Sequence, residues 1–188
     1  MESQADFLKR LQQVLNTLAV KTQALDELTP AQWAWSPNKN TWSLATTLDH
    51  LNISNGAILP LYENSTRNLI KSDKTGTPPL QYNRFERVFL RLVSPNPPFK
   101  VPVPPMYKPS LKDVNGANAL SIFRAQHEAI ANYLASCEGY DLMTEIITSP
   151  ASRLVKLRLG AQFDALLSHD QYHWGQIEEK LKHPNFPQ

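Results

Sequence analysis

Apolar residues recur every three or four positions along four segments of this 188-residue chain, and polar residues fill the positions between them. This spacing places the apolar side chains on one face of a helix, so it predicts four amphipathic helices. The first covers about residues 3–28, the second opens at residues 41–43, the third covers about 116–137 and the last about 160–182. Long helices with few strong strand signals favour an all-α fold, a four-helix bundle whose core these faces form.

The second predicted helix opens with Thr41-Trp42-Ser43, where either Thr41 or Ser43 can cap it. Pro60 falls within its apolar stripe and should kink or interrupt it, because proline lacks the amide hydrogen that the helix needs. His50 lies about 120° from the centre of that stripe, at roughly 100° per residue. A bundle helix that contacts two neighbours has a wide buried arc, so this position permits the burial of His50 without requiring it.

A long connection separates the second and third predicted helices, between about residues 72 and 115. Residues 84–93 can form a short helix. Residues 94–109 contain seven prolines, which exclude a continuous helix and favour an extended crossover. Such a segment can cross the end of the bundle and wall off a pocket, or it can simply connect two helices along the surface.

The composition indicates one globular, soluble domain over residues 1–188. Hydrophobic residues make up 41% of the chain and charged residues 19%, and the net charge of +2 comes from interleaved signs. Without a basic stripe, a polybasic tail or a long apolar stretch, the sequence favours neither nucleic acid nor a membrane as a partner. The single cysteine, Cys137, excludes an internal disulfide, and the polar N-terminus has no apolar signal region, so we expect a cytoplasmic protein.

The candidate chemistry lies in three histidines, His50 in the second predicted helix and His169 and His173 in the last. Histidines four residues apart share one face of a helix and can chelate one ion, and a third ring from another helix would complete a three-nitrogen site. Such a site, with one position open, activates a bound water or thiol. The alternative is a pair of polar residues on a half-exposed helix face, with no metal.

Three further residues could belong to the same pocket. Asp170 could accept a hydrogen bond from the free ring nitrogen of a metal-bound histidine on another helix, or pair with a Lys or Arg at the bundle edge. Gln176 lies three residues after His173 and could line the pocket or make only a local hydrogen bond. His127 lies on the apolar stripe of the third helix, which is typical of a hydrogen-bonded core residue; the alternatives are a pocket residue or an extra metal ligand.

The other reactive residue types fit structural roles better. Nothing near Cys137 in the sequence would depress its pKa strongly, so we expect an inert thiol. Core packing explains the tryptophans before the second helix better than ligand stacking does: Trp33, Trp35 and Trp42. Solvated surface charge explains the basic residues before the last helix better than binding of thiol carboxylates does: Arg153, Lys156 and Arg158.

The order of the motifs carries a family resemblance. Trp42-Ser43 is followed by His-Leu at 50–51, and the last helix reads His-Asp-Gln-Tyr-His-Trp-Gly-Gln-Ile from His169 to Ile177. This combination resembles the DinB/YfiT-like superfamily, and the match covers nearly the whole chain in helix order and spacing. The stretch Pro104–Pro109 looks like the proline-rich connection of many members.

The resemblance implies a four-helix bundle that holds a divalent metal at one end, with His50, His169 and His173 as the ligands by matching position. Zinc, nickel or iron would each accept this set. It further implies a metal-dependent enzyme, for which we expect a thiol S-transferase acting on a low-molecular-weight thiol and an electrophilic substrate, and a homodimer. The three histidines alone do not choose between this activity, a hydrolase on the same site and a non-catalytic bundle that binds a metal or ligand.

Overall fold

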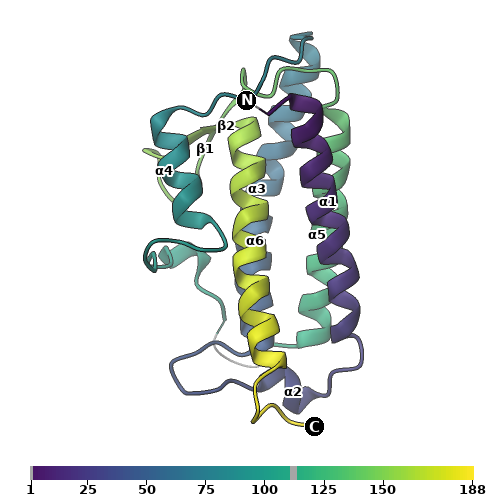
Figure 1. Cartoon of the computed structure of the whole chain (residues 1–188), viewed down its shortest axis with the longest axis vertical. Helices are drawn as coiled ribbons and strands as arrows, with labels where there is room; N and C mark the ends of the chain where they lie inside the picture. The colour runs from purple at the N-terminus through teal and green to yellow at the C-terminus, as the bar shows by residue number, and fades with distance from the viewer. Residues whose placement is uncertain (1, 111–113) are drawn as a thin grey trace.

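Four long helices form a bundle in the computed structural model, which describes residues 2–110 and 114–188 (Figure 1). They are α1 (Gln4–Thr22), α3 (Leu44–Lys71), α5 (Gly116–Ser136) and α6 (Leu159–Leu181). The predicted all-α fold is therefore confirmed. The first helix is shorter than predicted, because the 3-10 turn η1 (Gln23–Leu25) follows α1, and the short helix α2 (Pro30–Ala34) precedes α3. Of the helices described, none combines the length and the hydropathy that crossing a membrane requires.

Helix α3 begins where the sequence predicts. The Oγ of Ser43 accepts a hydrogen bond from the amide of Thr46, so Ser43 rather than Thr41 is the cap. Pro60 lies inside α3 and does not interrupt it, contrary to one of the two predictions for this residue. Because α3 packs against both α5 and α6, tertiary contacts hold the helix together across the hydrogen bond that proline removes.

The connection between α3 and α5 runs back along the bundle. These two helices point in the same direction, so the chain between them must return from one end to the other (Figure 1). The return includes the predicted short helix, α4 (Arg84–Val93), and its proline-rich part contains only the 3-10 turn η2 (Pro105–Tyr107). Phe89 of α4 packs in an apolar cluster with Ala165 of α6, which holds the connection against the bundle. Residues 111–113 of the predicted irregular segment lie outside the described residues.

A small hairpin precedes α6 and was not evident from the apolar pattern. Strands β1 (Ile146–Thr148) and β2 (Lys156–Arg158) pair antiparallel, and each buries only its central residue. Three-residue strands are too short to show the alternation that identifies a strand in a sequence. Arg158 ends β2 and donates through Nε to Oε1 of the buried Glu86 in α4, at 2.9 Å. The prediction that Arg158 is a solvated surface charge is therefore wrong.

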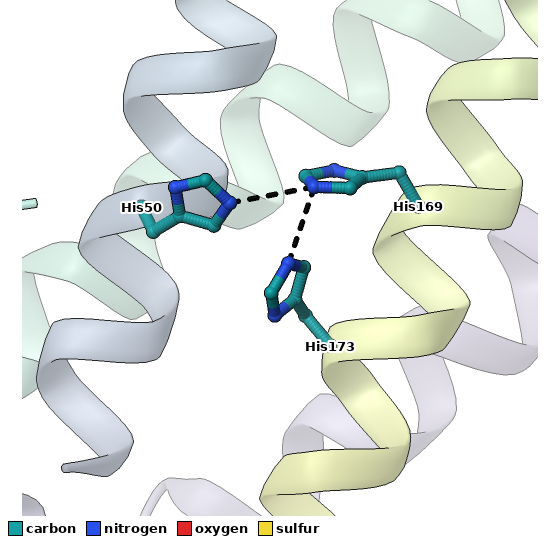
Figure 2. Close-up of side chains that lie close together, drawn as sticks. All are labelled: His50, His169 and His173. Carbon is teal, nitrogen blue, oxygen red and sulfur yellow. Dashed lines mark hydrogen bonds between the residues drawn. The ribbon is translucent and has the colours of Figure 1, made fainter. Parts of the chain in front are cut away.

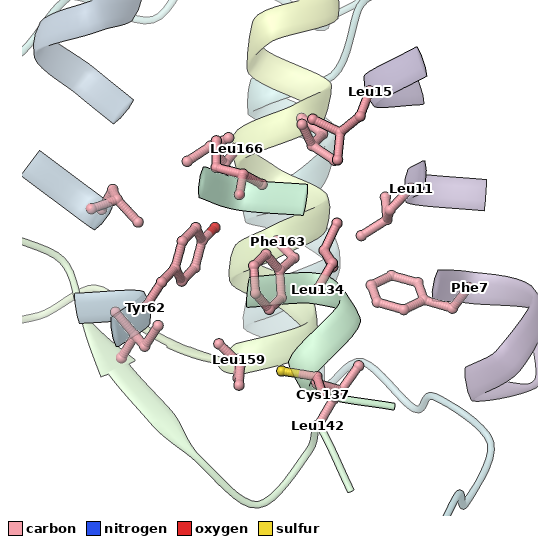
Figure 3. Packing of buried hydrophobic residues seen from close by; sticks show 14 of the residues in the cluster. Phe7, Leu11, Leu15, Tyr62, Leu134, Cys137, Leu142, Leu159, Phe163 and Leu166 are labelled. Atoms are coloured by element: carbon pink, nitrogen blue, oxygen red, sulfur yellow. The ribbon is translucent and has the colours of Figure 1, made fainter. Parts of the chain in front are cut away.

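The core consists of two apolar clusters. In one of them, the rings of Tyr62 and Phe163 stack with centroids 4.2 Å apart, surrounded by leucines of the long helices (Figure 3). The other includes Leu48, Phe123 and Trp174. Buried polar side chains occupy the stretches of α3, α5 and α6 between the residues of these clusters. Because a buried polar group needs a partner, this polar layer is where a functional site is expected.

Candidate metal centre

Three imidazole rings from two helices meet in the polar layer of the bundle (Figure 2). His50 comes from α3, and His169 and His173 come from successive turns of α6. Nε2 of His169 lies 3.3 Å from Nε2 of His50 and 3.1 Å from Nε2 of His173. Nitrogens that each lie about 2.0–2.1 Å from one tetrahedral ion are about 3.3 Å apart, so this spacing is compatible with one shared metal ion.

His50 is buried even though it lies beside the apolar stripe of its helix, and only 2% of it is exposed. Helix α3 contacts α5, α6 and η2, so its buried arc is wide. The Nδ1–H of His50 donates to the carbonyl oxygen of Tyr107 at 2.7 Å. The proline-rich connection therefore completes the burial of His50 and orients its ring.

The outer ring nitrogens fix the tautomers of two of the three histidines. The Nδ1–H of His50 donates to Tyr107, and the Nδ1–H of His173 donates to the amide oxygen of Gln176 at 3.0 Å. In a neutral ring this leaves a lone pair on each Nε2, and both lone pairs face Nε2 of His169. One proton on His169 satisfies only one of these two contacts, whereas a cation satisfies all three nitrogens. The donor set therefore fits a metal ion.

Burial keeps the three rings in the neutral form that binds metal. It lowers the pKa of His50, although the hydrogen bond to Tyr107 opposes the shift. It lowers the pKa of His173 to about 3, and the positive charge that His50 would carry adds to this effect. Burial also holds the pKa of His169 well below its ordinary value, with smaller contributions from the other two rings. At neutral pH no proton competes with a cation for these nitrogens.

All three rings line a cavity of about 650 Å³, a size typical of sites for small molecules. Its wall includes Phe89 and Val93 of α4 and, from the proline-rich connection, Val101, Pro104 and Tyr107. Of the two interpretations of that connection, the pocket wall is therefore the correct one. The rings thus face a partly open cavity through which a second molecule can approach them.

Trp42 lies directly against the histidines. Its ring centroid is 4.9 Å from that of His50 and 6.1 Å from that of His173, and its side chain also lines the cavity. The prediction of core packing is therefore wrong for Trp42, whereas Trp33 is buried in the core as expected. The difference arises because Trp42 immediately precedes the cap of α3, which projects it over the second turn of that helix.

Asp170 and His127 lie together in the core, away from the cavity lining. Asp170 is fully buried, and Nδ2 of Asn55 donates to its two carboxylate oxygens at 3.1 and 3.3 Å. Nε2 of His127 lies 3.0 Å from Oδ2 of Asp170, at an angle too oblique for a hydrogen bond. The Nδ1–H of His127 donates to the carbonyl oxygen of Phe123 at 2.9 Å. His127 is therefore a core residue hydrogen-bonded to the backbone of its own helix, and the hydrogen bonds to Asp170 come from Asn55.

Four polar residues after the histidines also line the cavity: Gln176, Glu179, Lys180 and His183. Gln176 does so while it accepts the hydrogen bond from His173. Lys180 was missed by sequence reasoning, because it ends the run Glu178-Glu179-Lys180, which is typical of a solvated helix face. Its spacing of four from Gln176 and seven from His173 was the available signal, since these positions share one face of a helix.

Cys137 takes no part in this site. Its side chain is buried in the apolar cluster around Phe163, and burial raises the pKa of the thiol to about 12. The thiolate, which is the reactive form, is therefore disfavoured. The expectation of an inert cysteine agrees with this environment, so any thiol chemistry in the cavity requires a thiol from outside the chain.

Comparison with known proteins identifies the family. The sequence profile of the DinB superfamily matches residues 13–177, a range that includes α3, α5 and the three clustered histidines. The chain matches none of the curated proteins and none of the solved structures with which it was compared. Because the profile spans most of the sequence and the fold is the helical bundle that the motifs imply, the chain belongs to the DinB superfamily.

Proposed function

We propose that this protein is a divalent-metal-dependent enzyme that transfers a low-molecular-weight thiol to an electrophilic substrate, with His50, His169 and His173 as the metal ligands. The observation that carries the proposal is the convergence of three ring nitrogens on the wall of a cavity. A divalent ion held there would act as a Lewis acid and lower the pKa of a thiol or a water. Zinc, nickel and iron all accept imidazole ligands.

The number of ligands favours catalysis over a purely structural ion. A structural zinc is normally enclosed by four protein ligands, whereas a catalytic one keeps a position open for water or substrate. Among the described residues, no fourth His, Cys, Asp or Glu joins the three histidines. The cavity beside them gives a thiol and an electrophile room to enter.

The residues around the rings support transfer rather than hydrolysis. Tyr107 and Gln176 hold His50 and His173 in the orientation that aims Nε2 at the common centre. Trp42 covers two of the rings, and apolar side chains of α4 and the proline-rich connection form much of the remaining wall. Such a wall limits the contact of the site with bulk water, which would otherwise compete with a thiol for the electrophile.

Metal content tests the ligand set. Purified wild-type protein should contain about one equivalent of divalent metal by elemental analysis, and His169→Ala should lose it, because two imidazoles bind far more weakly than three. His127→Gln is the matched control, since it changes another buried histidine that lies outside the cluster, and it should retain the metal. Absence of metal from the wild type, or equal content in His169→Ala, would reject the site.

Activity is tested separately with a chromogenic aryl halide and a panel of low-molecular-weight thiols. The metal-loaded wild type should accelerate thioether formation with at least one thiol, and His169→Ala should not. Turnover of an ester substrate in the absence of any thiol would instead identify a hydrolase. Metal binding without turnover in either assay would leave a binding protein and contradict the proposed enzyme.

We also propose that the protein works as a cytoplasmic homodimer. The single, buried cysteine supports a reducing compartment, because it forms no disulfide that an oxidising compartment would maintain. The dimer rests on what membership of the family implies. Light scattering on the eluting protein tests it, and a monomer mass at all accessible concentrations would contradict it.

A further inference from the structure

Lys180 is a buried cation in the wall of the same cavity. Only 5% of it is exposed, which is unusual for a lysine. Its Nζ donates to Oγ1 of Thr47 and to the carbonyl oxygen of Gln176, each at 3.2 Å. Because Gln176 precedes it by one helical turn, the ammonium group reaches back along α6 toward the histidines.

Lys180 has no counter-ion among the described residues. The ion pairs of the structure involve other groups, and the two partners of Nζ are neutral oxygens. Lys180 interacts with two other ionisable groups: Glu179, which lines the cavity with an exposed side chain and raises the pKa of Lys180 weakly, and His173, whose own pKa Lys180 lowers. Burial outweighs Glu179 and lowers the pKa of Lys180 to about 8, so the group is still mainly protonated at neutral pH. A buried positive charge of this kind is stabilised when an anion binds to it.

The opposite part of the cavity is mostly apolar, with the exposed Lys100 as its charged residue. Phe89, Leu92 and Val93 of α4 line it, together with Val101, Pro102 and Val103 of the proline-rich connection. This wall lies against the first half of α6, where Ala165 packs with Phe89. A ligand that fills this part of the cavity must therefore present hydrocarbon to the protein.

The histidines lie between these two parts along α6. Ala165 precedes His169 by four residues, and Lys180 follows His173 by seven, so all four positions line the cavity in this order. At 1.5 Å of rise per residue, Ala165 and Lys180 are roughly 22 Å apart along the helix axis, and the backward reach of the lysine shortens this span. An extended molecule that contacts both ends passes across the three ring nitrogens.

We propose that the cavity binds a small apolar carboxylic acid, with the carboxylate held by Nζ of Lys180 and the hydrocarbon body against α4 and the proline-rich connection. This assignment rests on the proposed function to the extent that it makes the acid the electrophilic substrate. The carboxylate orients the molecule, and the atoms between its two ends lie beside the histidines. Lys180 is thus a positioning residue that selects substrates with an acidic end.

Decanoate and decanol are the probes for this proposal, because they share a hydrocarbon chain and differ in the acid. Binding to the metal-free and the zinc-loaded protein is followed by calorimetry. The wild type should bind decanoate more tightly than decanol by roughly tenfold to a hundredfold, the range expected for a charged hydrogen bond. Lys180→Met should lose this preference and keep its affinity for decanol. Lys182→Met, which removes an exposed lysine two residues away, should behave as the wild type.

Four results would overturn the assignment. The first is equal or absent binding of the two probes by the wild type. The second is a preference for decanoate that survives in Lys180→Met. The third is a preference for decanoate that appears only with zinc and does not depend on Lys180. The fourth is weaker binding of 3-mercaptopropionate, but not of decanoate, by Lys180→Met, because the lysine would then serve the thiol. Since the metal-free titration needs no metal or turnover, its outcome is independent of the proposed transferase activity.

Discussion

His50 and Tyr107 join the proline-rich connection to the candidate metal centre. The carbonyl oxygen of Tyr107 accepts the Nδ1–H of His50 at 2.7 Å, across 57 residues of sequence. The turn η2 that presents this carbonyl begins with Pro105, whose ring restricts the backbone. The segment that walls the cavity therefore also holds one ring in the tautomer whose Nε2 can bind a cation.

Loosening this turn should weaken metal binding without removing a ligand. We expect Pro105→Gly to lower the affinity for zinc by roughly tenfold, in the range seen when the hydrogen-bond partner of a ligand is lost. Competition with a chromophoric chelator measures the affinity. Pro78→Gly, in the exposed part of the same connection, is the control and should match the wild type. Equal affinities for all three proteins would show that the turn does not orient His50.

Variants of Gln176 and Asp170 distinguish the orientation of a metal-binding ring from the stability of the core. Gln176→Ala should lower zinc affinity by about tenfold, because it frees the ring of His173.

Asp170→Asn should leave zinc affinity unchanged and lower the free energy of unfolding by about 1–3 kcal/mol, since it disturbs the buried contacts with Asn55 and His127. Chelator competition and urea denaturation give the two quantities. Loss of metal from Asp170→Asn with full stability would assign the carboxylate to the metal centre instead.

The ion pair between Glu86 and Arg158 should make the fold sensitive to acid. Burial alone would raise the pKa of Glu86, but its hydrogen bonds from Arg158 and Asn83 outweigh burial and lower it. A carboxylate with a lowered pKa contributes stability that is complete above its unfolded pKa, about 4.3, and is lost as the pH falls through the folded value. Glu86→Gln should therefore be less stable than the wild type by about 3 kcal/mol at pH 7.

Urea denaturation at several pH values checks this expectation. The difference between wild type and Glu86→Gln should shrink as the pH falls below about 4, because the wild type then loses the same charge. Glu63→Gln is the control, since its partner Arg67 forms only an exposed pair, and it should change stability by less than about 1 kcal/mol. A difference that stays constant with pH would show that the ionised pair contributes nothing.

Lys180 should limit stability at neutral pH. Its pKa is lowered to about 8 by burial, so the unfolded chain binds more protons at this residue than the folded protein does between about pH 8 and the ordinary value of 10.5. The contribution of Lys180 to the free energy of unfolding is therefore lowest below pH 8 and increases as the pH rises. Lys180→Met should be more stable than the wild type at pH 7 by about 1–3 kcal/mol.

The pH dependence separates this effect from better packing. The advantage of Lys180→Met should fall between pH 8 and 10.5, as the buried amine of the wild type loses its proton. Thermal unfolding of both proteins, with Lys182→Met as the exposed control, measures it. If Lys180→Met is less stable at every pH, the hydrogen bonds to Thr47 and Gln176 outweigh the burial of the charge.

The sequence predicted the parts of this structure that depend on local periodicity. The long helices follow from apolar spacing, the start of α3 from Ser43, and the shared face of His169 and His173 from a spacing of four. His50 was a candidate third ligand in the sequence, but its burial depends on contacts with η2 that the spacing within α3 does not reveal. Local patterns therefore identified which residues could ligate a metal, and tertiary packing decided that they meet.

Features that depend on contacts between distant segments were not predictable. Arg158 looked like a surface charge because its partner, Glu86, lies 72 residues earlier. Pro60 does not interrupt α3, because packing on two sides outweighs the lost hydrogen bond. Lys180 was not singled out in the sequence because its neighbours are acidic, and only the fold places it in the cavity wall.

One cation should bind to ring nitrogens from both α3 and α6. X-ray absorption at the zinc edge of the loaded protein measures this coordination. The spectrum should show a shell of about three imidazole nitrogens at about 2.0–2.1 Å plus one exchangeable oxygen ligand, and one nitrogen fewer in His50→Ala. A shell that is identical in wild type and His50→Ala, or a wild type that takes up no zinc, would contradict it.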